Sequence, residues 1–505
     1  MPVSNDIFEL VRVMTRKEKS FFRRYSRLNS AGKDGAMIKL FEKLVEYSAE
    51  RDTYDEEVLK NGLDAKTIKH FPVVKNNLYK LLLKSMNVCR EDNNNTERVK
   101  NLLEQYDILF SKSLLKQCES ILRKARKISE ENEMFFHLQD IMNKERVLAR
   151  YMLDADSYEK VIEKVYREQI INLEKIRNLT DMNDLGNRLT ILSQKNPTAK
   201  ARDESLMAEL KYITEHPLLK DESKMLSSTT LKRFYNLNTV TSEWRSDHSS
   251  AMVFARKYSE LVEKEVEIGK STIHEYIISL YANATACTRV DNFDEYEIVY
   301  EKLAGIHERF EYITERDKLE AFYYLGLDVF SASASNYHPE RGLKILEEAE
   351  LNHEQMGRWL SVQQKIVWYF VIARFCFSKG TYNDAGRWLN RLIQIPNIDV
   401  SQDYQCYARI MNLVVAYESG NPDRIEHELR RSYYFLTKRN KIYKYERIIL
   451  EYTRQAFKVR SQKEINEMLE FMHRDLSSIS NDPFEKNAFD AFNMIPWLEE
   501  KLLKT

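Results

Sequence analysis

The sequence predicts an all-α protein, and this prediction rests on its composition. Only 12 of the 505 residues are Gly and 9 are Pro, well below the average shares of about 7% and 5%. Both residues mark turns and weaken helix interiors, so a long chain that is poor in them has long helices and short connections. Charged residues make up 31% of the chain. Together these shares exclude a β-sandwich, a β-barrel, a collagen-like chain and a disordered tail.

Charge, cysteines and apolar runs bear on where the protein works. The 78 Lys and Arg residues balance 78 Asp and Glu residues, so the whole molecule has no net attraction for nucleic acid or an anionic membrane. Five scattered Cys residues do not form a secreted disulfide framework. No basic segment followed by an apolar stretch opens the chain, and its longest apolar run, residues 366–377, is too short to span a bilayer. We expect a soluble cytoplasmic protein with reduced thiols and no membrane partner.

Residues 1–91 are predicted to form a small helical domain. Thr15 and Glu18 have the spacing of a helix capping box, which opens a helix through about residue 27. Residues 30–35 then form a loop. The polar stretch 92–96 is the clearest linker in the chain and ends this domain. Further helices are expected at residues 37–47, 54–60 and 74–88.

The clearest helix hairpin of the chain is the segment 366–395. It has an apolar helix, a tight turn at residues 379–382 and a second helix that ends before Pro396. Ala385 lies three residues after the turn aromatic Tyr382. A small residue at that position lets two helices cross closely, while the aromatic ring packs beneath them.

Similar hairpins recur along residues 97–480, which we interpret as a repeat array. The turn anchors are residues 115, 158, 248, 293, 337 and 382, separated by 43, 90, 45, 44 and 45 residues. The gap of 90 is two periods, with the missing repeat near residues 199–213, and a shorter last step reaches residues 420–422. No hairpin buries its apolar face alone, so stacking supplies the core. The alternative is an irregular helical bundle.

The Gly-x-Tyr turn, the small residue after it and the closing Pro resemble a tetratricopeptide repeat (TPR). The period near 44 is longer than the 34 of a standard TPR, and lengthened hairpins or HEAT-like helix pairs would produce it. The resemblance implies a TPR-like α-solenoid. Residues 481–505, which open with Asp482 and Pro483 as a helix start, are predicted to be a C-terminal capping helix, or alternatively a docking helix for a partner.

Two short motifs add a second resemblance. The segment from Met14 to Phe22, with Thr15 and Glu18, and the stretch from Lys75 to Tyr79 resemble segments of uncharacterised helical-repeat proteins from Bacteroidetes bacteria. This resemblance would cover the whole chain. It implies no activity.

No catalytic or metal-binding signature is found in the sequence. Phosphate-binding Gly-rich loops, a nucleophile elbow, Cys-x-x-Cys pairs and His-Glu-x-x-His pairs are all missing. The ten His residues are dispersed. We therefore expect no enzyme activity, no cofactor and no metal site, since a hydrolase or transferase would need a pocket with perturbed acids.

The TPR resemblance implies that the first helix of each hairpin lines a concave groove. Aromatic side chains and an Arg at these positions would suit an extended or helical peptide; the alternative is packing between repeats. The first functional hypothesis is thus a non-catalytic protein-protein interaction scaffold or adaptor. The candidate groove residues are Tyr281, Tyr323, Phe370, Arg374, Phe377, Tyr407 and Tyr417.

A basic segment at residues 12–33 supports a second hypothesis. Its cations can release counterions from phosphates, and the interleaved Phe21, Phe22 and Tyr25 can stack on bases, although the same spacing is typical of a buried helix face. The alternative function is therefore a regulator associated with nucleic acid or ribonucleoprotein, with the repeats as sensor. The candidate contacts to phosphate or an acidic partner are Arg16, Lys17, Lys19, Arg23, Arg24 and Arg27.

Overall fold

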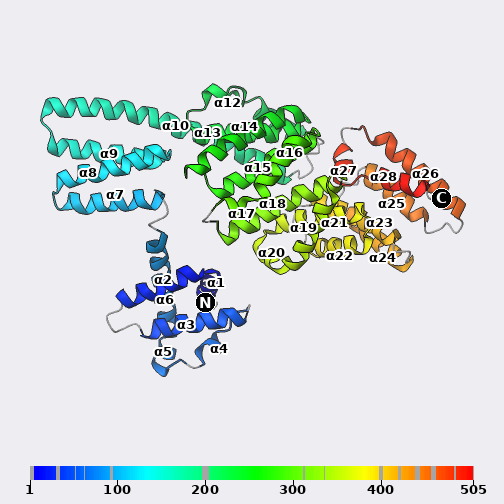
Figure 1. Ribbon diagram of the computed structural model, residues 1–505, viewed down its shortest axis with the longest axis horizontal. Coiled ribbons are helices and arrows are strands. Elements are labelled where there is room, and N and C mark those ends of the chain that lie inside the picture. Colours follow the sequence, from blue (N-terminus) through cyan, green and yellow to red (C-terminus); the bar gives the residue numbers. More distant parts are fainter. Residues whose placement is uncertain are drawn as a thin grey trace. The chain divides into compact units, whose positions relative to one another are not determined.

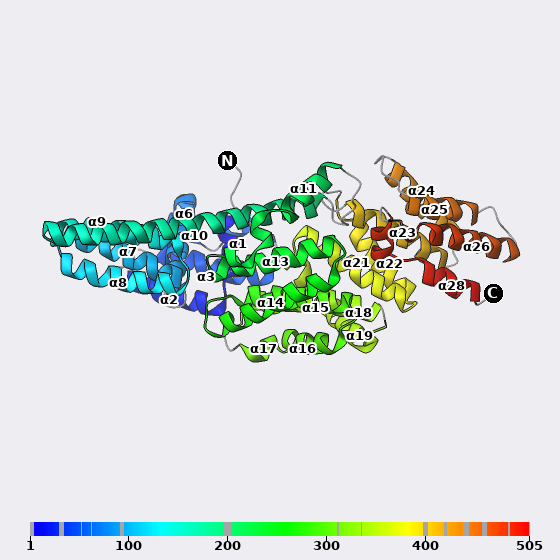
Figure 2. The same ribbon diagram turned by 90° about the horizontal axis from the view of Figure 1, so that it is seen from above.

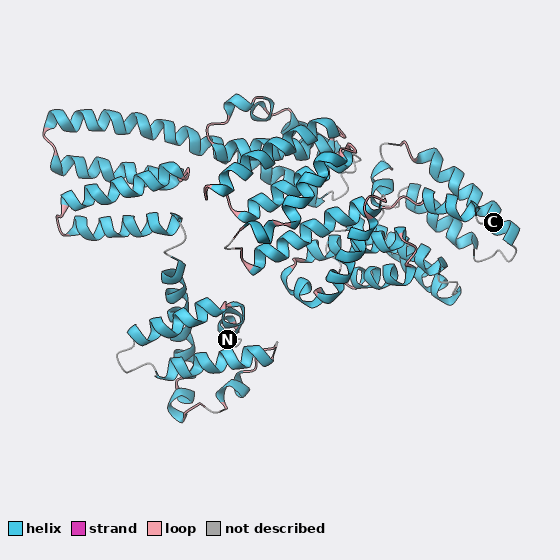
Figure 3. Cartoon of the chain, viewed as in Figure 1, coloured by secondary structure: helices cyan, strands magenta, loops and turns pink. Residues whose placement is uncertain are grey.

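The structure is a computed structural model, and every regular element that it describes is a helix (Figure 3). This confirms the predicted all-α class. Over the described ranges, no helix carries an apolar stretch long enough to cross a bilayer. The described residues are 5–29, 35–51, 53–61, 63–90, 95–195, 204–310, 313–334, 336–396, 402–418, 422–437, 444–456, 462–482 and 485–503.

The chain divides into two compact units, residues 1–173 and 174–505. The division falls inside one long helix, α10 (Ala155–Lys195). The predicted boundary at residues 91–97 follows the sixth helix, and residues 91–94 lie outside the described ranges. A separate N-terminal domain ending there stays a prediction.

Of the first six helices, all but α5 contribute side chains to one apolar core. Phe22 packs against Phe41 with ring centroids 4.5 Å apart. The predicted capping box is confirmed, because the Thr15 backbone N–H donates to Glu18 Oε2 at 2.8 Å and the Glu18 N–H donates to Thr15 Oγ1 at 3.2 Å. The six helices are α1 (Asp6–Val13), α2 (Arg16–Asn29), α3 (Gly35–Glu50), α4 (Glu56–Lys60), α5 (Ala65–Lys69) and α6 (Phe71–Arg90).

The predicted helices of this region are found with shifted bounds, and two short helices, α1 and α5, were missed. The prediction 54–60 corresponds to the shorter α4. The predictions 37–47 and 74–88 correspond to α3 and α6, which extend further at both ends. Helix α5 has only 5 residues, too few for a hydrophobic period to be recognised. Its start is fixed instead by Asp64, whose side chain accepts from the Thr67 N–H at 2.8 Å.

Arg126 ties together the later helices of the first unit. Its guanidinium donates to Glu130 at 2.8 Å, to Glu145 at 2.7 Å and to Glu168 at 2.6 Å. These acids come from α8, α9 and α10, so a single half-buried cation links three helices. The helices before α10 are α7 (Asn95–Ser111), α8 (Leu115–Glu131) and α9 (Phe135–Met152).

In the second unit most helices pack against their sequence neighbours (Figure 1 and Figure 2). Helix α15 also contacts α18, which in turn contacts α21. The helices are α11 (Glu204–Thr214), α12 (Pro217–Lys220), α13 (Ser228–Trp244), α14 (His248–Glu267), α15 (Ile273–Arg289), α16 (Phe293–Ala304), α17 (Ile306–Arg309), α18 (Glu315–Ala334), α19 (Pro339–Leu351), α20 (His353–Trp359), α21 (Val362–Ser378), α22 (Tyr382–Ile393), α23 (Gln402–Glu418), α24 (Pro422–Thr437), α25 (Lys444–Ala456), α26 (Gln462–Ile479), α27 (Lys486–Ala491) and α28 (Ile495–Leu503), with a short 3₁₀ turn at Glu222–Lys224.

Several predicted turn anchors coincide with helix starts. Helices α14, α16 and α22 begin at His248, Phe293 and Tyr382. The turn before α22 contains Gly380 with φ of 73°, a left-handed conformation that favours glycine. However, α10 is one continuous helix of 41 residues, and part of the expected missing repeat, residues 199–203, lies outside the described ranges. A regular period of 44 residues and a TPR-like solenoid are therefore not confirmed.

The C-terminal helices bury the aromatic side chains that the sequence places there. Phe489, Phe492 and Trp497 all join the core of the second unit. Helix α28 packs against α26. The expected helix start at residues 482–485 falls partly outside the described ranges, since Pro483 is not described.

Candidate functional site

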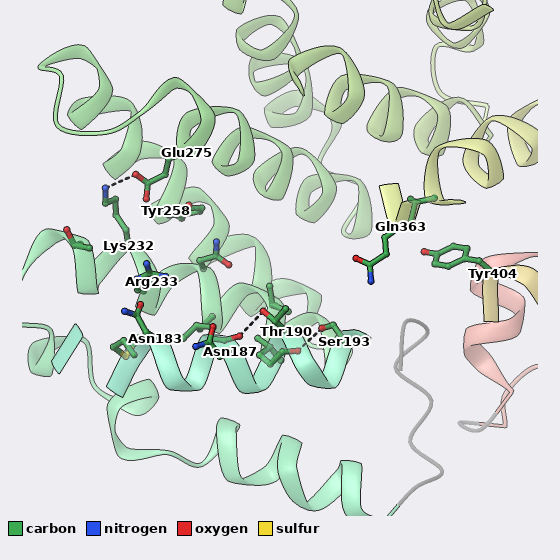
Figure 4. A pocket seen from close by; sticks show the side chains of 18 residues that line it. Asn183, Asn187, Thr190, Ser193, Lys232, Arg233, Tyr258, Glu275, Gln363 and Tyr404 are labelled. Carbon is green, nitrogen blue, oxygen red and sulfur yellow. Dashed lines mark hydrogen bonds and ion pairs between the residues drawn. The ribbon is translucent and has the colours of Figure 1, made fainter. Parts of the chain in front are cut away.

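The second unit contains a cavity of about 880 Å³. Its walls come from the second half of α10, from α13, from two positions on α21 and from single positions on α14, α15 and α23 (Figure 4). The polar and charged residues of the wall include Asn183, Asn187, Lys232, Arg233, Asn236, Tyr258, Glu275, Gln363 and Tyr404. These hydroxyls, carboxamides and charged groups share the wall with the apolar side chains of Met182, Leu189, Leu237, Val240 and Val367. The cavity thus offers a ligand both polar and apolar contacts.

Lys232 on α13 is the most buried charged group of the cavity wall, with a side chain only 7% exposed. Its Nζ forms ion pairs with Glu265 at 2.8 Å and Glu275 at 2.9 Å, and it donates to Ser271 Oγ at 2.8 Å. Burial alone lowers the pKa of Lys232, but the two glutamates outweigh this effect and the net pKa is raised. The ammonium therefore stays charged, and its role here is to hold α13 to the connection between α14 and α15.

Glu265 is held in its charged form by the same cluster. Ser271 donates its hydroxyl to Glu265 Oε2 at 2.8 Å, and Ser228 donates to Oε1. Burial raises the pKa of Glu265, yet the hydrogen bonds from Lys232, Ser228 and Ser271 outweigh it, so the net pKa is lowered. The cluster is saturated by its own members.

Two carboxamides on α10 face the cavity and form no hydrogen bond with the residues that the structure describes. Asn183 Oδ1 is buried and receives no hydrogen bond from a described residue. Asn187, one turn further along, is exposed and lines the same cavity. Because the two residues are four positions apart, they share a helix face with a rise of about 6 Å between them. A buried acceptor without a donor is costly, so Asn183 is suited to accept a hydrogen bond from a ligand.

Other cavity groups are partly engaged. Asn236 hydrogen-bonds the hydroxyl of Tyr258, which is itself buried. Gln363 is exposed, and Tyr404 is half-buried with its ring 5.2 Å from that of Phe370. Arg233 is exposed at the cavity and forms no ion pair with the described residues.

The predicted groove residues do not line this cavity. Tyr323, Phe370 and Tyr407 are at most 4% exposed and belong to the core, so as placed they cannot contact a partner. Arg374 donates to Ser331 Oγ at 3.2 Å, and Tyr281 packs on another tyrosine ring, that of Tyr324, at 4.8 Å.

The last two groove candidates are covered by the C-terminal segment. Phe377 meets Phe492 edge to face at 5.1 Å, and Tyr417 meets Trp497 at 5.9 Å. The groove assignment depended on TPR geometry, in which these helix faces stay open. Here helices α27 and α28 bring additional aromatic rings onto them.

The predicted basic residues lie on α2 in different environments. Arg16, Lys17 and Arg24 are exposed and have no ion pair within the described part of the chain. Arg23 instead forms a bidentate pair with Glu42, with both distances 2.7 Å.

The remaining two cations of α2 interact with their neighbours. Arg27 is exposed and contributes to the lowered pKa of Glu42, whose main cause is the hydrogen bond from Arg23. Lys19 is half-buried, and burial followed by the nearby Arg23 lowers its pKa. Arg16, Lys17, Arg24 and Arg27 thus remain as the open cationic face of α2.

The sequence did contain a signal for the cavity that was missed. Asn is unfavourable inside helices because its side chain competes with the backbone. Asn183 and Asn187 nevertheless lie well inside a helix of 41 residues, one turn apart. Two Asn residues at these positions therefore indicate a role other than stabilising the helix.

Comparisons with known proteins add no assignment. No family model matches the chain, and no curated protein or solved structure matches it. Among the described residues, no group of three or more His, Cys, Asp or Glu side chains could hold a metal ion.

Proposed function

We propose that the protein is a non-catalytic helical-repeat scaffold that binds an extended segment of a partner protein in the cavity of the second unit. The observation that carries this proposal is the pair Asn183 and Asn187, which face the cavity without hydrogen bonds to described residues. A carboxamide both donates and accepts, so it can pair with the N–H and C=O of a peptide.

The spacing of the pair supports an extended ligand. Side chains four residues apart on a helix are separated by a rise of about 6 Å. An extended chain presents equivalent backbone groups every two residues, or about 6–7 Å. The two carboxamides can therefore engage successive backbone groups on one edge of the same peptide.

The test is a selection of peptide ligands on the full-length protein. Random peptides displayed on phage are enriched on the wild-type chain, and the affinity of synthetic copies is measured by fluorescence anisotropy. Replacing Asn183 and Asn187 together by Ala removes two hydrogen-bonding groups and should weaken binding about tenfold or more, since each hydrogen bond contributes about 0.5–1.5 kcal/mol.

The matched control is Asn390→Ala, which removes an exposed carboxamide from α22, outside the cavity. It should leave peptide affinity unchanged. If no peptide is enriched, or if the cavity and control variants bind the enriched peptides equally well, the proposal is wrong.

A second candidate function is binding of single-stranded nucleic acid by α2. It is favoured by the open cations Arg16, Lys17 and Arg24 and by the position of the Arg24 guanidinium, 6.0 Å from the Phe21 ring. Each phosphate contact on a single strand contributes a slope of about −0.7 to the salt dependence. Proteins that bind single strands combine cations, which contact the phosphates, with aromatic rings, which stack on the bases. Helix α2 carries both kinds of group.

The test of this second candidate compares two charge-matched double variants. Lys17→Glu with Arg24→Glu should weaken binding of a fluorescent single-stranded RNA and flatten its salt dependence. Arg146→Glu with Arg150→Glu, on the exposed side of α9, changes the net charge equally and should have no such effect beyond weak long-range repulsion. Equal behaviour of the two variants would exclude α2 as the contact.

A further inference from the structure

The two cations of the cavity wall, Lys232 and Arg233, differ in how they are paired. Lys232 is matched by Glu265 and Glu275, and Glu275 is the acid of that cluster that also lines the cavity. Arg233, its neighbour in sequence, is exposed and lines the same cavity (Figure 4). No described acid lies within ion-pair distance of Arg233, so its guanidinium is the cation of the described wall that has no ion pair.

The surroundings of Arg233 favour a carboxylate from outside. One turn away on α13 are the uncharged Thr229 and Leu237, and Asn236 and Tyr258 line the same wall. These groups do not neutralise a cation. A guanidinium presents donors in a planar fork that matches a carboxylate, and such charge-assisted pairs are stronger than neutral hydrogen bonds.

We propose that the cavity selects acidic peptides, with an Asp or Glu side chain of the ligand paired to Arg233. This inference rests on the proposed function, because it assigns the side-chain preference of the peptide that the α10 carboxamides would hold. Lys232 does not share in this selection, since its charge is already matched. The preference thus depends on a single residue.

The experiment is a pair of peptide selections in parallel, on the wild-type chain and on Arg233→Glu. Wild-type peptides should carry Asp or Glu at a fixed position, and the variant should enrich Lys or Arg at that position. Synthetic peptides with amidated C-termini, so that only side-chain carboxylates are scored, should lose affinity about tenfold or more when the charge at this position is reversed. Added salt should weaken the wild-type pairing.

Two further variants test whether the acidic preference comes from the charge of Arg233. Arg233→Gln removes the charge with little change in size, and it should abolish the acidic preference without creating a basic one. Lys344→Glu reverses an exposed cation on α19, outside the cavity, and should select the same acidic peptides as wild type.

The results separate this inference from the proposed function. Peptides that depend on Asn183 and Asn187 but show no acidic preference would overturn the role of Arg233 and leave the scaffold proposal standing. An acidic preference that persists in Arg233→Gln would also overturn it. Peptides that ignore the carboxamide pair altogether would overturn both.

Discussion

Gly326 of α18 lies directly against the indole ring of Trp368 of α21. A Cβ at position 326 would be only 2.4 Å from the ring, closer than real carbon atoms approach. Trp368 is 1% exposed and in the core, so it has no room to move aside. The missing side chain at residue 326 is what allows these two helices to meet at this point.

Gly326→Ala should therefore destabilise the protein although Ala is the better helix former. Overpacking of this kind costs about 1–3 kcal/mol. The free energy of unfolding, measured by urea titration followed by circular dichroism, should fall by that amount. Gly357→Ala is the control, because a Cβ there would meet nothing within 4 Å, and it should raise stability by about 0.5–1 kcal/mol. Equal shifts for both variants would contradict the close contact.

Lys232→Met should be strongly destabilising, because it leaves Glu265 charged and buried without its main partner. Removing one member of a buried ion pair costs about 3 kcal/mol or more. Lys257→Met removes a pair with Glu222 whose side chains are 45% and 44% exposed, and such surface pairs contribute less than about 1 kcal/mol. Unfolding titrations of both variants test the contrast. A small loss for Lys232→Met would show that the cluster does not hold α13 in place.

Asp328→Asn should change how stability depends on pH. Burial raises the pKa of Asp328 to about 7, and the hydrogen bond with Tyr296 only partly opposes this. An acid whose pKa is raised on folding takes up a proton, so stability is complete at low pH and is lost as pH rises from about 4 to about 7. Between about pH 5 and pH 8 the wild type should lose roughly 2–3 kcal/mol relative to the variant.

The measurement for this prediction is thermal unfolding across that pH range. Asp294→Asn, at an exposed position on α16, serves as the control and should follow the wild-type curve. In acid the stability of Asp328→Asn should be close to that of the wild type, and in base it should be higher. Parallel curves would mean that the carboxyl of Asp328 is not buried as described.

Much of the local structure was accessible from the sequence. The scarcity of Gly and Pro predicted the helical class, and the turn at Gly380 and the capping box of Thr15 and Glu18 were located correctly. These features depend on interactions between residues near one another in the chain. The short helix α5 escaped because it is fixed by a cap at Asp64 rather than by a hydrophobic period.

The choice of residues that face the cavity was decided by the tertiary structure. Helical periodicity shows which side chains share a face, but it does not show what covers that face. Phe370 and Tyr407 have the spacing of groove residues, yet they lie in the core, while rings of the C-terminal helices cover Phe377 and Tyr417. The sequence by itself thus determined the helices and their turns. Packing between segments far apart in the chain decided which polar groups, such as Asn183 and Arg233, remain available to a ligand.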